Sequence, residues 1–496
     1  MTNYTKVAFR GAAIVLVVSL LAAFLGYLVR FLLARNLSVE EFGLFYAVFS
    51  FLGLLGIFKS LGLDRSLVKF IPEFMHKGNN NLIKSSIIYV SIVQLITNSI
   101  VIVLVYLFSS YLGVHYFHNP RADIVLKLMA IAFFIDSFTF TLKFAFQGFQ
   151  KMMLFAGIDL VRMVLILSIA FIGFKLNYKL LSPIIAYIFV PFILIFAFTP
   201  ILTKKVFPKF FKSKFISNRA IFRKILKYSI FVIATDAGTL ILGYTDTIVL
   251  TYFSGLVNVA LYNVALPTAK LLTFFPKAVM GVLAPLSAEL WAKREKILLR
   301  DGMDLLYKYS IMIILPLVFV MFSFSGLLLN VFFGKDYILA SNSLKILSVG
   351  MIFAALFGIN SSFFSGIGKP QINSKVVYTA AIFNLAGNLI LIPIIGIVGA
   401  AITTTIGYFI MMYMGLAEIR KFIDIILPIK IWIKTSLIGL IFIFTIWYLK
   451  KIIFLNVWLE TAIVLAISGI VYITLLFLLK VIDINEVKEL HKRVVK

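Results

Sequence analysis

Apolar runs of about 20 residues recur from one end of this sequence to the other, with short polar segments between them. A helix of that length rises about 30 Å, which is the thickness of the hydrocarbon core of a bilayer. Hydrophobic residues make up 62% of the 496 positions and charged residues 14%. Soluble domains are only about 45–50% apolar, so a water-soluble fold is excluded. The sequence predicts an all-α, polytopic membrane protein.

About fourteen such runs can be distinguished by their length and composition. The first, 14–33, is followed by no convincing signal-peptide cleavage site, and we interpret it as a retained helix. An even number of spans places both ends of the chain on one side of the membrane. The expected spans are 10–34, 42–63, 84–110, 122–146, 152–174, 180–202, 228–252, 257–285, 305–333, 342–365, 372–394, 397–419, 430–449 and 458–480.

The chain is strongly basic, with 47 Lys and Arg against 20 Asp and Glu, a formal net charge of +27. In a soluble protein this excess would indicate nucleic acid, but in a membrane protein basic residues gather in cytoplasmic loops. Placing both termini in the cytoplasm leaves about 33 basic residues on that side and about 9 outside. We therefore expect a multi-pass protein of the cytoplasmic membrane with cytoplasmic termini. Its basic loops would contact anionic membrane lipids and no nucleic acid.

The most basic interruption, 203–227, contains no acidic residue and divides the chain. Short patterns recur on its two sides at a nearly constant offset, which indicates a parallel internal repeat with a substrate site between its halves. The matching positions are Gly148 with Gly366, Glu73 with Glu289, and Lys77 with Lys293.

The repeat predicts four parts of the chain. Residues 1–202 would form an N-terminal lobe of six helices, and 203–227 a basic cytoplasmic linker. Residues 228–420 would form a C-terminal lobe of six helices, and 421–496 helices 13 and 14 with a cytoplasmic tail.

Four short motifs in a fixed order carry a family resemblance. Residues 35–45 read Arg-Asn-Leu-Ser-Val-Glu-Glu-Phe-Gly-Leu-Phe, and 60–73 read Ser-Leu-Gly-Leu-Asp-Arg-Ser-Leu-Val-Lys-Phe-Ile-Pro-Glu. Residues 244–246 read Tyr-Thr-Asp, and 366–370 read Gly-Ile-Gly-Lys-Pro. The chain resembles the polysaccharide-synthesis flippases of the multidrug/oligosaccharidyl-lipid/polysaccharide exporter superfamily. The resemblance implies a two-lobed, alternating-access flippase for an oligosaccharide linked to a prenyl phosphate or pyrophosphate, and we expect a monomer without cofactor or metal.

Charges within apolar spans cost several kcal/mol, so they indicate function or pairing. Lys270 lies about 18 Å of helical rise from the start of its expected helix, near the midplane. Lys277 shares its face, and nearby prolines predict bends that expose carbonyls to a cavity. Lipid II flippases line their central cavity with cations on helices 1, 2 and 8, so the resemblance implies that Arg30, Lys59 and Lys270 bind a substrate phosphate. Snorkelling of Arg30 and Lys59 and pairing of Lys270 with an acid stay open as alternatives.

Two other couples in the spans are expected to neutralise themselves. Asp159 and Arg162 lie one helical turn apart, and Asp136 and Lys143 lie two turns apart on one face. We therefore predict structural pairing within each of these two helices.

Asp236 and Asp246 have no basic residue within their expected helix. Lipid II flippases bind sodium through an Asp on helix 7, an Asn and an Asp four apart on helix 11, and a Thr on helix 12. The resemblance therefore implies a coupling-ion site at Asp236, Asn384, Asn388 and Thr404. Asn388 replaces the second acid, which lowers the charge of the site and leaves Na⁺ or H⁺ open as the ion. The two asparagines would equally serve to hold helices together.

Other classes of function fit the sequence less well. A membrane enzyme would need a catalytic site on a substantial loop, whereas the longest external loop has about a dozen residues. The chain contains no Cys, which removes thiol nucleophiles and zinc clusters. A scaffold would not need charge near the midplane. A cation-coupled multidrug exporter of the same superfamily remains as the alternative function.

Overall fold

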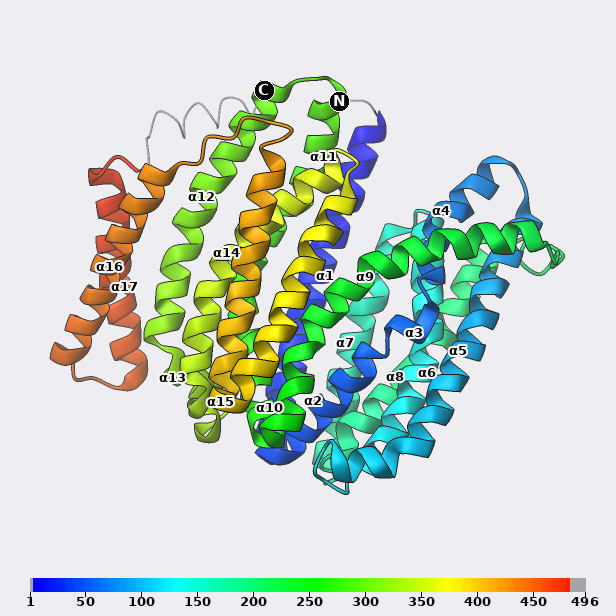
Figure 1. The fold of residues 1–496 in the computed structure, drawn as a ribbon, viewed down its shortest axis with the longest axis horizontal. Helices are drawn as coiled ribbons and strands as arrows, with labels where there is room; N and C mark the ends of the chain where they lie inside the picture. Colours follow the sequence, from blue (N-terminus) through cyan, green and yellow to red (C-terminus); the bar gives the residue numbers. More distant parts are fainter. Residues whose placement is uncertain (1–2, 482–496) are drawn as a thin grey trace.

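The computed structural model consists of helices joined by short turns (Figure 1) and describes residues 3–481, which form no strand. Side chains at 3–10, 12–13, 60, 231, 234–236, 275, 278–279 and 281–282 lie outside the described set. The helices are α1 (Asn3–Asn36), α2 (Val39–Leu54), α3 (Ile57–Ser60), α4 (Leu63–His76), α5 (Asn80–His115), α6 (Ala122–Gly148), α7 (Met152–Lys175), α8 (Leu181–Pro200), α9 (Arg219–Phe253), α10 (Gly255–Lys270), α11 (Phe274–Ala292), α12 (Lys296–Ser323), α13 (Ser325–Phe332), α14 (Ser341–Gly366), α15 (Pro370–Ile419), α16 (Ile429–Ile452) and α17 (Val457–Leu478).

The helix pattern agrees with the expected all-α membrane fold. Among the described residues, 11 helices are long and apolar enough to cross a membrane. One of them, α15, is divided by non-helical backbone at Ile395 and Gly396 into two spans that fold back on each other (Figure 1). The broken run from α2 to α4 and the more polar α9 account for the remaining expected spans.

Expected helix 2, 42–63, is broken into the three pieces α2, α3 and α4. Leu61 and Gly62 have φ angles of 48° and 66°, a left-handed conformation that ends α3 and starts α4. A Cβ on Gly62 would also lie 2.8 Å from the backbone oxygen of Ser229. The break places Lys59 on α3, where irregular backbone at membrane depth is tolerated beside a cavity.

Expected helix 8 is also broken, next to its deepest cation. The 3₁₀ turn Leu271–Thr273 separates α10 from α11 and begins directly after Lys270. Pro267 and Pro276 lie on either side of this turn. Each proline removes a backbone donor that a continuous helix would use, which favours an interruption between them. The α-helix is therefore interrupted where the prolines predict a bend.

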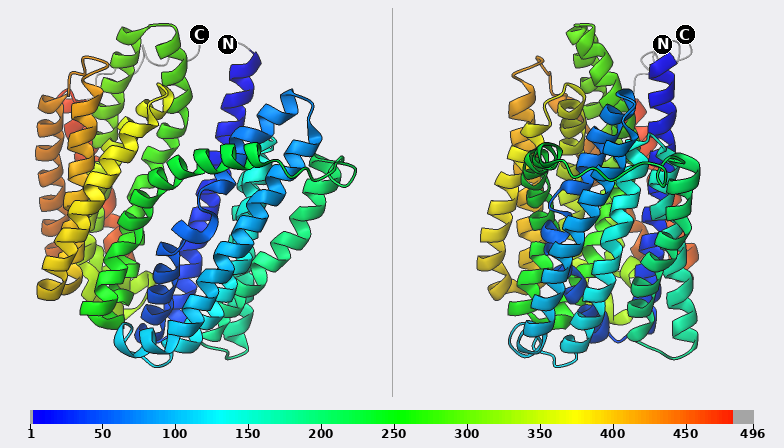
Figure 2. Two further views of the ribbon diagram at one scale, coloured as in Figure 1. Left: turned by 45° about the vertical axis from the view of Figure 1, so that its right-hand side comes forward. Right: turned by 90° about the vertical axis from the view of Figure 1, so that its right-hand side faces the viewer.

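The helices form two groups, with α5 to α8 on one side and α12 to α17 on the other (Figure 1). Helix α9 runs between them and contacts both α4 and α15. The first and last described residues lie at the same end of the molecule (Figure 2). This is the arrangement that an even number of spans requires.

The two halves of the chain are packed together at the end opposite the termini, through α1 and α2 of the first half and α10 and α13 of the second. Helices α2 and α10 approach so closely that a Cβ on Gly43 would lie 1.9 Å from the backbone oxygen of Leu256. Arg35 at the end of α1 donates to the backbone oxygens of Asn330 at 3.0 Å and Phe332 at 3.2 Å. These carbonyls end α13 and have no partner within that helix. The molecule is therefore closed at this end.

Two close helix contacts recur in the two halves of the chain. A Cβ on Gly148 of α6 would lie 2.6 Å from the backbone oxygen of Leu67 on α4. A Cβ on Gly366 of α14 would lie 2.5 Å from the backbone oxygen of Ala284 on α11. The same contact thus occurs at the matched glycines of the predicted repeat. The division into lobes stays a prediction, which this likeness supports.

Helix α9 begins earlier than expected. Its first residue is Arg219, so the expected start at 228 is wrong. The Asn218 side chain accepts from the backbone nitrogen of Ala220 at 2.9 Å and so caps the helix start. Lys224 on this first part binds Glu73 of α4 at 2.9 Å. The second part of the basic segment is therefore ordered against the N-terminal half.

Candidate functional site

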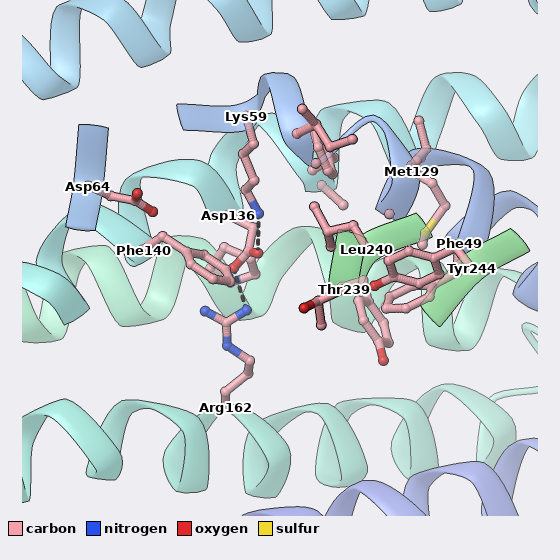
Figure 3. Close-up of a pocket in the computed structure, with 18 of the residues that line it drawn as sticks. Phe49, Lys59, Asp64, Met129, Asp136, Phe140, Arg162, Thr239, Leu240 and Tyr244 are labelled. Carbon is pink, nitrogen blue, oxygen red and sulfur yellow. Dashed lines mark hydrogen bonds and ion pairs between the residues drawn. The ribbon is translucent and has the colours of Figure 1, made fainter. Parts of the chain in front are cut away.

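A cavity of about 410 Å³ lies between the broken helix 2, α6 to α8 and α9 (Figure 3). Ligand sites typically have about 300–1,000 Å³. Its wall is mostly aromatic and aliphatic, with a few charged side chains. The aromatic members are Phe49, Phe133, Phe140, Phe144, Tyr187 and Tyr244, and the charged members are Lys59, Asp64, Arg65, Asp136 and Arg162.

Asp136 of α6 binds two cations in this cavity (Figure 3). Its Oδ2 lies 2.7 Å from Nζ of Lys59, and its Oδ1 lies 2.5 Å from an amino nitrogen of Arg162 on α7. Thr139 also donates to Oδ1, at 2.7 Å. Lys59 is therefore paired with an acid and does not snorkel to the interface.

The predicted couples within α6 and α7 are wrong. Asp136 pairs with Arg162, and Lys143 pairs with Asp159. Helices α6 and α7 form an antiparallel hairpin whose turn lies near residues 149–151. Residues equally far from that turn lie at the same depth, so the charges meet across the hairpin and not along one helix.

Lys270 lies near Arg30 and Lys277. These three cations are separate from the ion pair that Lys59 forms with Asp136. Arg30 contacts the backbone oxygen of Asn263 and the side-chain oxygen at 3.4 Å, and its guanidinium carbon lies 4.1 Å from the ring centre of Tyr46. The charges of Asp246, Lys277 and Arg30 all act on Lys270, and that of Asp246 is the strongest of the three. The side chain of Lys270 makes no hydrogen bond or ion pair with a described residue. Substrate binding by these cations stays a prediction.

Three of the four expected coupling-ion residues surround Asp246. Asn384 and Asn388 of α15 donate from Nδ2 to its Oδ1 at 3.1 and 2.7 Å. Thr404 donates to Oδ2 at 2.6 Å, and Tyr262 of α10 donates to the same oxygen. All five side chains are buried. A half-turn of each amide would present oxygens in place of donors, as a cation would require.

The expected acid of this site, Asp236, lies on α9, but its side chain is outside the described residues. The sequence reasoning noted Asp246 and did not place it at the centre of the cluster. It also missed Tyr262 and Arg162. The signal for Arg162 was available, because its depth in the hairpin matches that of Asp136.

Comparisons with known proteins extend over nearly the whole chain. The family model described as "Polysaccharide biosynthesis protein" matches residues 8–291, and the model MatE matches 232–390. An uncharacterized membrane protein of Methanocaldococcus jannaschii is 36% identical over 100% of both chains. The "Probable low-salt glycan biosynthesis flippase Agl15" of Haloferax volcanii is 22% identical over 79% of each chain.

Solved structures share the fold. The lipid II flippase MurJ in an inward closed conformation has a TM-score of 0.74 at 18% identity, covering 92% of this chain and 97% of that one. An inward-facing multidrug resistance transporter of the MATE family has a TM-score of 0.66 at 15% identity, covering 84% and 93%. At these identities the likeness concerns the fold alone.

Proposed function

Because this chain belongs to the polysaccharide biosynthesis protein family of the multidrug/oligosaccharidyl-lipid/polysaccharide exporter superfamily, we propose that it flips a lipid-linked oligosaccharide across the cytoplasmic membrane. The carrier would be a prenyl phosphate or pyrophosphate. The named relatives that match it include a glycan biosynthesis flippase. The protein would act as a transporter and not as an enzyme.

The observation that carries the proposal is the position of Lys270. Its side chain lies near Arg30, Lys277 and the buried acid Asp246, and makes no hydrogen bond or ion pair with a described residue. Three cations near one acid leave an excess of positive charge, which costs several kcal/mol at membrane depth and favours a ligand of opposite charge. The phosphate of a carrier lipid has that charge, and several weak cations release it more readily than one ideal clamp.

The packing of the two groups of helices fits one state of an alternating-access cycle. The molecule is closed at the end where Gly43 meets Leu256, which is opposite the termini. With the basic segment 203–227 in the cytoplasm, the closed end would face outward. The glycan would enter the wet space between the lobes from the cytoplasm while the prenyl tail stays in lipid.

The buried cluster around Asp246 would couple flipping to Na⁺ or H⁺. It joins α9, α10 and α15, so a change of charge there acts on three helices at once. Its centre would be Asp246, with Asn384, Asn388 and Thr404 as ligands. An ion that replaces the donor contacts would shift the relative positions of these helices.

A cation-coupled multidrug exporter is the second candidate, because the MatE model matches 232–390. The cavity argues against it. Three basic residues and two acidic residues line its wall, so its formal charge is positive and unsuited to cationic drugs.

The test of the function uses purified full-length protein in proteoliposomes. A fluorescent prenyl-pyrophosphate-linked oligosaccharide should move between leaflets faster than in protein-free vesicles, and more slowly when the ion gradient is collapsed. Efflux of a cationic dye should not exceed that of empty vesicles. Dye efflux without movement of the lipid-linked sugar would establish the exporter instead.

A further inference from the structure

Asp136, Lys59 and Arg162 carry unequal charge at the wall of the cavity (Figure 3). One carboxylate faces two cations, Lys59 at 2.7 Å and Arg162 at 2.5 Å. The three side chains are mostly buried, with exposures of 12%, 18% and 14% for Lys59, Asp136 and Arg162. Asp64 and Arg65 also line the wall, so its three cations and two acids leave one excess positive charge, which a low-dielectric wall screens poorly.

The hydrogen-bonding capacity of the three groups is unequal as well. Both oxygens of Asp136 are occupied, by Lys59 on one side and by Arg162 and Thr139 on the other. Arg162 also donates to Thr139 at 2.6 Å, but its Nε is buried and has no acceptor among the described residues. A guanidinium has five N–H donors, and a buried donor without an acceptor costs about 1–3 kcal/mol. Arg162 therefore has a donor without an acceptor, whereas each oxygen of Asp136 accepts at least one hydrogen bond.

The amine of Lys59 is placed between two aromatic rings. Its Nζ lies 4.7 Å from the ring centre of Phe133 and 4.3 Å from that of Phe140. These contacts hold the charge in place without neutralising it. A tetrahedral anion with several oxygens could accept from Lys59 and from the guanidinium of Arg162 together, in place of Asp136, as carboxylates and phosphates do with paired cations.

We propose that Lys59 and Arg162 form a binding subsite for a phosphate or pyrophosphate group of the carrier lipid, and that Asp136 is an internal counter-ion with which this group competes. The inference rests on the proposed function. The resemblance already implies Lys59 as a phosphate ligand, and the inference adds Arg162 as a second cation and Asp136 as the competing acid. In the empty protein, Asp136 lowers the cost of two buried cations. When the substrate enters, its phosphate takes over contacts that Asp136 makes, which keeps binding weak enough for release.

Substitution of Asp136 tests the competition directly. In Asp136→Asn the size is kept, but the counter-ion is lost, so inorganic pyrophosphate should bind about tenfold more tightly to the detergent-purified full chain, as measured by titration calorimetry. Asp159→Asn is the matched control, because it frees Lys143 on the same pair of helices but outside the cavity wall. Its affinity for pyrophosphate should equal that of the wild type. Unchanged or weaker binding by Asp136→Asn would overturn the proposal.

Substitution of Arg162 is a second test of the proposal, and it remains informative if Asp136→Asn does not fold. Arg162→Gln leaves Asp136 and Lys59 as a neutral pair and should abolish pyrophosphate binding, whereas Arg162→Lys should keep part of it. Wild-type binding by Arg162→Gln would overturn the proposal. Geranyl diphosphate separates the two sources of phosphate: it should bind more tightly than inorganic pyrophosphate, and equal affinities would assign the subsite to free anions and reject the carrier lipid.

The flipping assay distinguishes this inference from the proposed function. If the wild type flips the lipid-linked oligosaccharide while Arg162→Gln flips and binds like the wild type, the subsite is wrong and the function stands. If the wild type binds geranyl diphosphate through Arg162 but flips no lipid-linked sugar, the subsite stands and the function is wrong.

Discussion

Asn388 donates from Nδ2 to Oδ1 of Asp246 at 2.7 Å, and this buried contact joins α15 to α9. The resemblance to lipid II flippases implies an acid at the position of Asn388. With an amide there, neutral donors satisfy the carboxylate of Asp246 when no ion is bound, so an ion has to displace these contacts. The contact therefore decides how strongly the cluster depends on an ion.

Asn388→Asp should make folding of the cluster depend on sodium. The carboxylates of Asp246 and the new Asp would repel each other unless a cation lies between them. The melting temperature in sodium chloride should therefore be higher than that in choline chloride by about 5 °C or more. The wild type should show a smaller difference. Differential scanning fluorimetry at equal ionic strength measures both. An equal sodium response in the two proteins would exclude Asp246 and Asn388 from the ion site.

Gly43→Ala should open the end opposite the termini, which the proposed orientation places outside. The added Cβ would meet the backbone oxygen of Leu256, which cannot move aside without separating α2 from α10. A single Cys at Thr268, which is 1% exposed in the closed state, should then be labelled from outside about fivefold faster. Gly157→Ala is the control, because nothing lies within 4 Å of its added Cβ. Unchanged labelling would show that the gate lies elsewhere.

The orientation can be tested with the same background, because the chain has no Cys. Lys209→Cys is exposed in the basic segment and should react with a membrane-impermeant maleimide only after the cells are opened. Arg121→Cys, at the opposite end, should react in intact cells, since its side chain is 72% exposed. The reverse pattern would place the termini outside.

The sequence was sufficient for the spans because hydrocarbon thickness imposes one length on every helix. It was not sufficient for the breaks. The left-handed pair Leu61 and Gly62 lies within an apolar run, and only the contact of Gly62 with Ser229 in space explains it. Length and hydropathy average over such positions, so expected helix 2 was continuous.

The candidate site was predicted in its parts and not in its pairings. The resemblance to lipid II flippases implied Asn384, Asn388 and Thr404 as one set, and the three side chains do contact one another, because the first two lie one turn apart and the third follows a tight hairpin. Asp136 was paired with Lys143 because they share a helix face. In the structure, Asp136 pairs across the hairpin with Arg162. This contact depends on how α6 and α7 pack together, which a single sequence does not specify.

Glu73 should hold the start of α9 against α4 in a pH-dependent way. Hydrogen bonds from Lys77 and Lys224 lower its pKa from 4.5 to about 2. A lowered carboxyl pKa contributes stability that is present above pH 4.5 and is lost as the pH falls through 2. Glu73→Gln should therefore exchange amide hydrogens in the first turns of α9 about threefold faster at pH 7, a modest effect for an exposed pair.

Glu289→Gln is the matched control for Glu73→Gln. Glu289 binds only Lys293, at 2.7 Å on its own helix, among the ion pairs of the described residues. Its loss should leave the exchange of α9 unchanged. Hydrogen exchange with mass spectrometry compares the two variants, and equal exchange in both would show that Lys224 does not anchor α9 through Glu73.

Charge at Lys270 should matter more than shape. Arg has the same charge as Lys but a different shape. If the charge recognises the phosphate of the carrier, Lys270→Arg should keep much of the flipping rate. Lys270→Gln should fall to about a tenth of the wild-type rate or less, and Lys270→Glu further, because it repels the phosphate. Lys270→Arg and Lys270→Gln should fold, since the Lys270 side chain makes no hydrogen bond or ion pair with the described residues. Lys270→Glu adds a second acid near buried Asp246, so its melting temperature is compared with that of the wild type first. Flipping of a labelled lipid-linked oligosaccharide in proteoliposomes is the measurement. A wild-type rate for Lys270→Gln would remove this residue from the mechanism and leave the phosphate to the subsite at Lys59 and Arg162.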